Sequence, residues 1–70
     1  MLIFTDSDRK FLESNFKNAN DLLTSTDRRE VLDALYDLID EKGFAPPDYQ
    51  EYNDFGREAQ TVYDRIYLNN

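Results

Sequence analysis

The chain has 70 residues, and its fifteen acidic and eight basic side chains give a net charge of −7 at pH 7. It is long enough for a single domain, residues 1–70, near the lower size limit for folding without a metal or a disulfide. Cysteine and histidine are absent, which excludes disulfides and the usual zinc sites. The acidic balance disfavours nucleic acid and anionic lipid as partners and favours a basic protein.

Membrane attachment and secretion are not expected. The longest apolar run, residues 1–4, is far shorter than the roughly 20 residues of a membrane span. No basic segment followed by an apolar stretch marks a signal peptide. We therefore expect a cytoplasmic protein with no membrane, metal or cofactor site.

The first predicted helix covers residues 6–17. Thr5 and Asp8 have the spacing of a capping box at its start. Asp6 and Asp8 also resemble the beginning of a calcium loop, but the glycine and closing glutamate of that loop are missing, so we interpret them as capping residues. A strand over residues 1–4 stays open, although it would need a partner strand. The expected buried side of the helix comprises Phe11, Leu12 and Phe16.

The second predicted helix covers residues 27–42 and follows a short helical turn at residues 21–23. Asp27 is a suitable N-cap, with Glu30 at capping-box spacing. Gly43 suits the left-handed position that follows many helices, and Phe44 is the apolar residue expected just beyond such a cap. The two prolines that follow prevent continuation of the helix. The apolar stripe expected in the core comprises Val31, Leu32, Leu35, Leu38 and Ile39.

Acidic and tyrosine side chains are the candidate binding residues. The carboxylates opposite the stripe of the second helix are Asp33, Asp37, Asp40 and Glu41. They form either a solvated face or a docking surface for a basic partner. The tyrosines in excess of a core this small are Tyr36, Tyr49, Tyr63 and Tyr67. They either pack at the edge of the core or contribute to a protein interface.

The third predicted helix, residues 53–68, has two interpretations. Its apolar residues follow steps of 3, 4, 3 and 4, typical of one continuous amphipathic helix. These residues are Tyr52, Phe55, Ala59, Val62 and Ile66. A start with Asp48 as the cap and Glu51 at capping-box spacing places Gly56 inside the helix, at a cost of about 1 kcal/mol relative to alanine. A start at Asn53 or Asp54 places Gly56 in the first turn, where this cost is smaller.

The second interpretation rests on the six-residue spacing of Gly56 and Val62 and on the sequence Gln60-Thr-Val-Tyr63. This pattern resembles the helix-turn-helix of bacterial regulators, and residues 29–68 are similar in order to LexA-like winged-helix domains. The resemblance implies a turn at Gly56, a recognition helix over residues 58–68 and a homodimer. The DNA contacts it implies are Arg57, Gln60, Thr61 and Arg65. The sequence departs from the family at Glu51 and Tyr52, where an aliphatic residue and alanine are usual, and carboxylates around the recognition face oppose phosphate binding.

Catalysis is not expected from this composition. The chain has no histidine for general acid–base chemistry, and its two glycines are isolated, so no phosphate-binding loop is present. We predict an all-α bundle of about three helices that acts as a non-enzymatic, acidic regulatory or interaction module. Its partner would be another protein, which could itself be basic or bind nucleic acid. The alternative is a helix-turn-helix DNA-binding transcriptional regulator.

Overall fold

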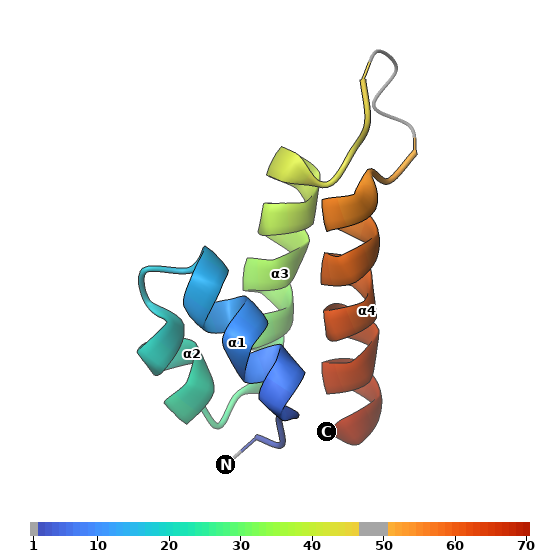
Figure 1. Cartoon of the computed structure of the whole chain (residues 1–70). Coiled ribbons are helices and arrows are strands. Elements are labelled where there is room, and N and C mark those ends of the chain that lie inside the picture. The colour runs from blue at the N-terminus through green and yellow to red at the C-terminus, as the bar shows by residue number, and fades with distance from the viewer. Residues whose placement is uncertain (1, 47–50) are drawn as a thin grey trace.

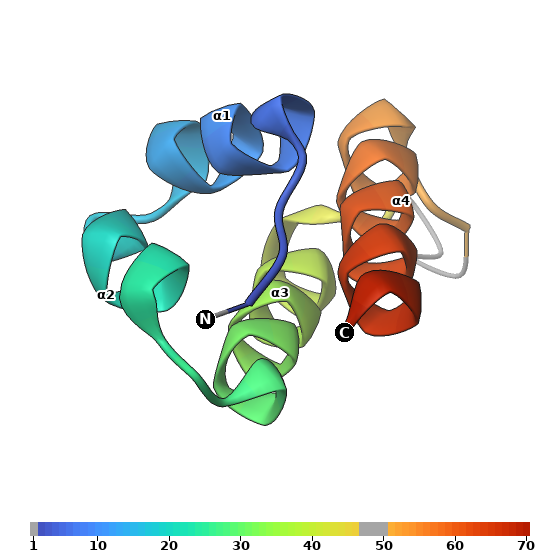
Figure 2. The same cartoon turned by 90° about the horizontal axis from the view of Figure 1, so that it is seen from below.

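The described part of the chain contains four helices: α1 (Asp6–Asn15), α2 (Ala19–Thr24), α3 (Arg28–Lys42) and α4 (Asp54–Asn69). The computed structural model describes residues 2–46 and 51–70. The long helices α3 and α4 lie side by side and antiparallel (Figure 1). Seen from below, α1 bridges α2 and α4, and the four helices surround a common centre (Figure 2). The all-α prediction is confirmed, with four helices in place of about three.

The additional helix is α2, where the sequence predicted only a short turn. Its six residues are too few for a stable helix in isolation, so it depends on tertiary burial. Leu22 and Leu23 are 1 % and 7 % exposed, and Ala19 is also buried. The core therefore stabilises this segment as a helix.

The first helix begins as predicted and ends two residues early. The Thr5 hydroxyl accepts from the Asp8 backbone N–H at 3.1 Å, and the Asp8 carboxylate accepts from the Thr5 N–H at 3.2 Å, which confirms the capping box. At the other end, the Asn15 side chain donates to the Phe11 carbonyl at 2.8 Å, and Phe16 has an extended backbone. Asn15 thus binds a carbonyl of the last turn, and the helix stops before residue 17.

The core forms where the predicted apolar stripes meet. All five stripe residues of α3 are buried, from Val31 to Ile39. From α4 the core receives Ala59, Val62 and Ile66. Tyr52, which the stripe placed in the core, precedes α4 and remains 37 % exposed, because the helix begins after it, at Asp54.

The two glycines of the chain meet where the end of α3 crosses the start of α4. Gly43 is the C-cap of α3 with φ −91°, so the predicted left-handed cap is wrong. Gly56 is the third residue of α4, and the turn at Gly56 that the helix-turn-helix alternative requires is not present there. A Cβ added to Gly56 would overlap the Gly43 carbonyl oxygen and lie 2.8 Å from its carbonyl carbon and 2.9 Å from its Cα. Glycine is required at this crossing because the two backbones touch.

Asn53 holds the same junction together. As the N-cap of α4, its side-chain oxygen accepts from the Gly56 N–H at 2.6 Å. Its side-chain nitrogen donates to the Lys42 carbonyl at 2.8 Å, and its backbone N–H donates to the Gly43 carbonyl at 2.9 Å. One residue thus satisfies groups at the end of α3 and at the start of α4. The cap predicted for Asp48 lies outside the described residues.

The segment before α1 is not a strand in residues 2–4, and Met1 lies outside the described residues. Asn70 binds it from the end of α4. The Asn70 side chain accepts from the Ile3 N–H at 2.7 Å and donates to the Ile3 carbonyl at 3.0 Å. The Asn70 amide thus forms the hydrogen bonds with the Ile3 backbone that a partner strand would otherwise form. The only bridge of strand type among the described residues joins Phe44 and Tyr52.

Candidate functional site

The outer face of α3 carries an acidic stripe, by which we mean Asp33, Asp37 and Glu41. These residues are four apart in a helix, so they lie in one row, and all three are exposed. Within residues 2–46 and 51–70 none of them forms an ion pair. Like charges at this spacing destabilise a helix by about 0.2–0.5 kcal/mol per pair. The stripe therefore costs α3 some stability and leaves its negative charge uncompensated on the surface.

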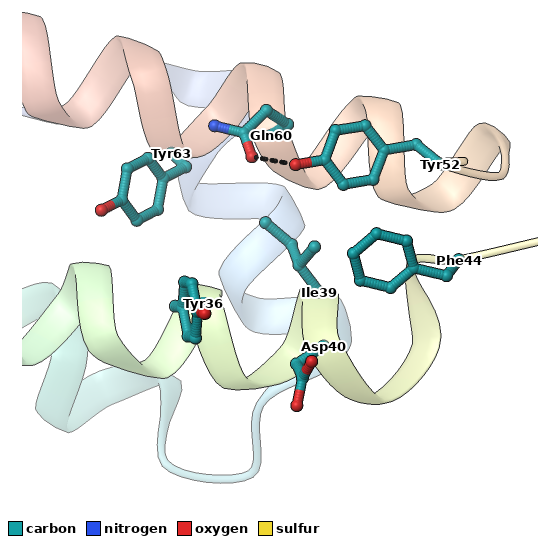
Figure 3. A pocket seen from close by; sticks show the side chains of 7 residues that line it. All are labelled: Tyr36, Ile39, Asp40, Phe44, Tyr52, Gln60 and Tyr63. Atoms are coloured by element: carbon teal, nitrogen blue, oxygen red, sulfur yellow. Dashed lines mark hydrogen bonds between the residues drawn. The ribbon is translucent and has the colours of Figure 1, made fainter. Parts of the chain in front are cut away.

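Beside the stripe, α3 and α4 enclose an open groove of about 350 Å³ (Figure 3). We call it the aromatic groove, and its lining comprises Tyr36, Ile39, Asp40, Phe44, Tyr52, Gln60 and Tyr63. Tyr63 and Gln60 extend from α4 on one side, and Tyr36 and Asp40 extend from α3 on the other. Of these seven described residues, four are aromatic and none is cationic.

Backbone pairing fixes one end of the groove. The Phe44 and Tyr52 backbones pair antiparallel, with the Ala45 N–H bonded to the Glu51 carbonyl at 2.8 Å. Their rings lie 5.2 Å apart between centroids with a tilt of 30°. This separation and tilt are favourable for an aromatic pair. The two rings are therefore in place before any ligand arrives.

Hydrogen bonds fix the wall formed by α4. The Tyr52 hydroxyl donates to Gln60 Oε1 at 3.0 Å, as the dashed line in Figure 3 marks. Gln60 Nε2 in turn donates to Asp64 Oδ1 at 2.9 Å. This chain of bonds orients the Gln60 amide, so that the groove has a defined polar edge along α4.

The structure brings together part of the predicted binding surface. Tyr63 and Asp40 line the groove, and the acidic stripe runs along the same helix as Asp40. Tyr67 lies at the other end of the helix pair, where the Arg28 guanidinium is 4.9 Å from its ring centroid. That cation already covers one face of the Tyr67 ring. Tyr49 lies outside the described residues.

Sequence reasoning missed three groove residues. The sequence pattern predicts Tyr52 in the core, Phe44 in a contact beyond the second helix, and Gln60 only as a DNA contact. The signal that could have found them is the position of the two glycines on either side of the Pro-containing segment. Because the two backbones touch at those glycines, the residues near each glycine lie close together.

The four predicted DNA contacts do not form one free surface. Arg65 binds Asp8 with its Nε at 2.8 Å and Nη2 at 2.7 Å from Oδ1. Arg57 pairs with Asp54 at 3.3 Å, and the Thr61 hydroxyl donates to the Arg57 carbonyl at 2.9 Å. Gln60 lies in the aromatic groove, on the α3 side of α4, whereas Arg65 reaches α1. Both arginines of this set are thus engaged by carboxylates.

Asp8 is the only buried charged side chain among the described residues, with no exposed surface. One of its oxygens caps α1 and the other binds Arg65 of α4. A buried carboxylate needs such a cation and hydrogen bonds to offset its lost hydration. Asp8 therefore connects two helices that are far apart in sequence, and its oxygens are occupied by this structural role.

Metal and membrane sites are not found in the described part of the chain. No helix of residues 2–46 and 51–70 combines the length and apolar character that crossing a bilayer demands. The same residues contain no group of three or more potential metal ligands in reach of one ion. Comparison with protein families, curated proteins and solved structures finds no match to this chain. The acidic stripe and the aromatic groove are the surface features of this chain that bear on its function.

Proposed function

We propose that this protein is a non-enzymatic, acidic regulatory module of the cytoplasm that binds a basic region of another protein. The contact surface is the exposed face of α3 together with the aromatic groove. A basic protein that itself binds nucleic acid is a suitable partner, because a surface evolved for phosphates is complementary to a row of carboxylates.

The observation that carries the proposal is the acidic stripe beside the groove. Three carboxylates repeat at four-residue intervals with no cation paired to them among the described residues. A positive surface that approaches the stripe relieves the repulsion between its carboxylates. The electric field of the whole chain, whose net charge is −7, accelerates association with such a surface.

The aromatic groove supplies binding affinity, which the charge of the stripe alone does not provide. Exposed ion pairs contribute only about 0–1 kcal/mol each, so a stripe of carboxylates gives speed and selectivity more than affinity. Tyrosines that an incoming chain desolvates are among the residues that carry most binding energy at protein interfaces. Tyr36 is 65 % exposed and stands between the stripe and the groove on α3, where a partner contacting both would bury it.

The DNA-binding alternative has less support. Its two arginines, Arg57 and Arg65, are paired with Asp54 and Asp8. Phosphate contacts by such cations provide nearly all non-specific DNA affinity. The resemblance to helix-turn-helix proteins requires a turn at Gly56 before the recognition helix. Gly56 instead lies within α4.

Calorimetric or fluorescence titration with a lysine- and arginine-rich peptide tests the proposal. We expect binding that weakens as salt is raised, because the contact is largely electrostatic. The variant D33N/D37N/E41Q should bind several-fold more weakly, since it removes the acidic stripe while leaving the groove in place.

The matched control is E13Q/D21N/E58Q. It also removes three negative charges, but from exposed positions on α1, α2 and α4. Loss of affinity confined to the stripe variant supports the assigned surface. Equal loss in both variants would mean that only net charge matters, and an absence of binding would refute the proposal.

A further inference from the structure

The aromatic groove has the composition of a cation site. Tyr36, Phe44, Tyr52 and Tyr63 present rings on both sides of the slot and at one end, and buried Ile39 lies between the two helices (Figure 3). The faces of aromatic rings carry the negative part of their quadrupole, so they attract a cation placed against them. Asp40 adds a carboxylate at the α3 rim.

The charge of the surroundings agrees with this composition. Among the residues that the structure describes, those lining the groove include one carboxylate and no lysine or arginine, and the acidic stripe continues along α3 beside it. A purely apolar ligand would gain nothing from Asp40 or from the Gln60 amide. An anionic ligand would be repelled. A group that is both positively charged and able to stack on rings uses every feature of the lining.

Arginine fits this description better than lysine. Its guanidinium is planar, stacks on aromatic faces and is less strongly hydrated than an ammonium, and it donates two parallel hydrogen bonds to a carboxylate. The chain itself uses this contact, since Arg28 stacks on Tyr67 at 4.9 Å from the ring centroid.

We infer that the aromatic groove is the pocket for an arginine side chain of the basic partner. This inference rests on the proposed function and identifies an arginine side chain as the residue that anchors the partner. At about 350 Å³ the groove is at the small end of ligand pockets, which span about 300–1,000 Å³. It is a site for one side chain of a larger partner. The Phe44–Tyr52 backbone bridge and the Tyr52–Gln60 hydrogen bond hold the site open in advance.

The test is an NMR titration of the full isotope-labelled chain with a short Gly/Ser peptide that carries one central arginine. Its analogues carry citrulline, which has a similar shape and no charge, or lysine at the same position. A single anchor is expected to bind with a dissociation constant of the order of millimolar. We expect shifts of Tyr36, Ile39, Phe44 and Tyr63 with the arginine peptide, smaller ones with lysine, and none with citrulline.

Single substitutions locate the site. Tyr36→Leu should weaken binding of the arginine peptide about three- to tenfold, the range for loss of one cation–π contact. Tyr36→Phe, which keeps the ring, should bind like the original chain. Asp40→Asn should also weaken arginine binding. The control is Tyr67→Leu, which removes an exposed ring outside the groove and should leave the affinity unchanged. Tyr36 and Tyr67 are at least half exposed, so both variants keep the core intact.

The outcomes separate the two proposals. If the arginine-rich peptide binds to the acidic stripe but leaves the groove resonances in place, the arginine pocket is refuted while the proposed function stands. Equal binding of citrulline or lysine peptides, or insensitivity to Tyr36→Leu, refutes the pocket as well. If no basic peptide binds anywhere on α3, the proposed function fails with it.

Discussion

Replacing Gly56 by alanine tests the role of the glycine crossing. In an ordinary helix this substitution stabilises by about 0.5–1 kcal/mol, because alanine has the higher helix propensity. Here the new Cβ would overlap the backbone carbonyl of Gly43, and a backbone group cannot rotate away as a side chain can. We therefore expect Gly56→Ala to destabilise the protein, whereas helix propensity alone would predict that it stabilises the protein.

The magnitude follows from what must move. Separating two packed segments to admit one carbon costs about 1–3 kcal/mol. The shift also strains the bonds from Asn53 to the Lys42 and Gly43 carbonyls, each worth about 1 kcal/mol. After subtraction of the propensity gain, we expect Gly56→Ala to lower the free energy of unfolding by about 2–3 kcal/mol. In a domain of this size that corresponds to a fall of about 10–20 °C in Tm.

Urea and thermal unfolding followed by circular dichroism measure this change. The isolated peptide of residues 51–70 is the control, because it contains Gly56 without Gly43. In that peptide Gly56→Ala should raise the helix content, while the same substitution destabilises the whole chain. If the substitution stabilised both, the close approach of the two backbones would be refuted.

Three further predictions concern Asp8, the junction and DNA. Arg65→Met should lower the free energy of unfolding by about 2–3 kcal/mol, because Asp8 would be buried without a cation. Asp8→Asn added to it should recover part of the loss, and additive effects in urea titrations would contradict the pairing. Asn53→Ala should cost about 1–2 kcal/mol through loss of the cap and of the bond to Lys42, and Asn53→Ser, which keeps only the cap, should cost less; in urea unfolding, a loss for Asn53→Ser as large as that of Asn53→Ala would contradict the cap, and no loss for Asn53→Ser would contradict the bond to Lys42. In gel-shift assays at low salt, micromolar protein should leave duplex DNA unshifted, and a retarded band would reopen the helix-turn-helix alternative.

Local sequence information determined the helices α1, α3 and α4 of this protein. The Thr5–Asp8 capping box and the Asp27 cap depend on residues at most three apart, and both were predicted correctly. The buried stripe of α3 follows from the period of the helix itself. Where a boundary was wrong, another interaction decided it. An Asn15 side chain ended α1 early, and burial against other helices turned residues 19–24 into α2.

Part of the candidate surface was also visible in the sequence. The four candidate carboxylates of α3 (Asp33, Asp37, Asp40 and Glu41) had to share its outer side because the inner side was apolar, and all four are exposed. Their proximity to a tyrosine groove was not visible. The groove takes its walls from α3 and α4, and no periodicity within one helix indicates which rings of another will face it.

Only the tertiary structure decided the roles of the two glycines and of Asp8. Gly43 suggested a left-handed cap and Gly56 a turn, since those are the local reasons to use glycine. The actual reason is non-local, because the two backbones touch each other. Likewise Asp8 and Arg65, 57 residues apart, could be assigned to a cap and a DNA contact until the fold paired them. Sequence determines what each residue can do locally, and contacts between distant segments decide which of those roles remains.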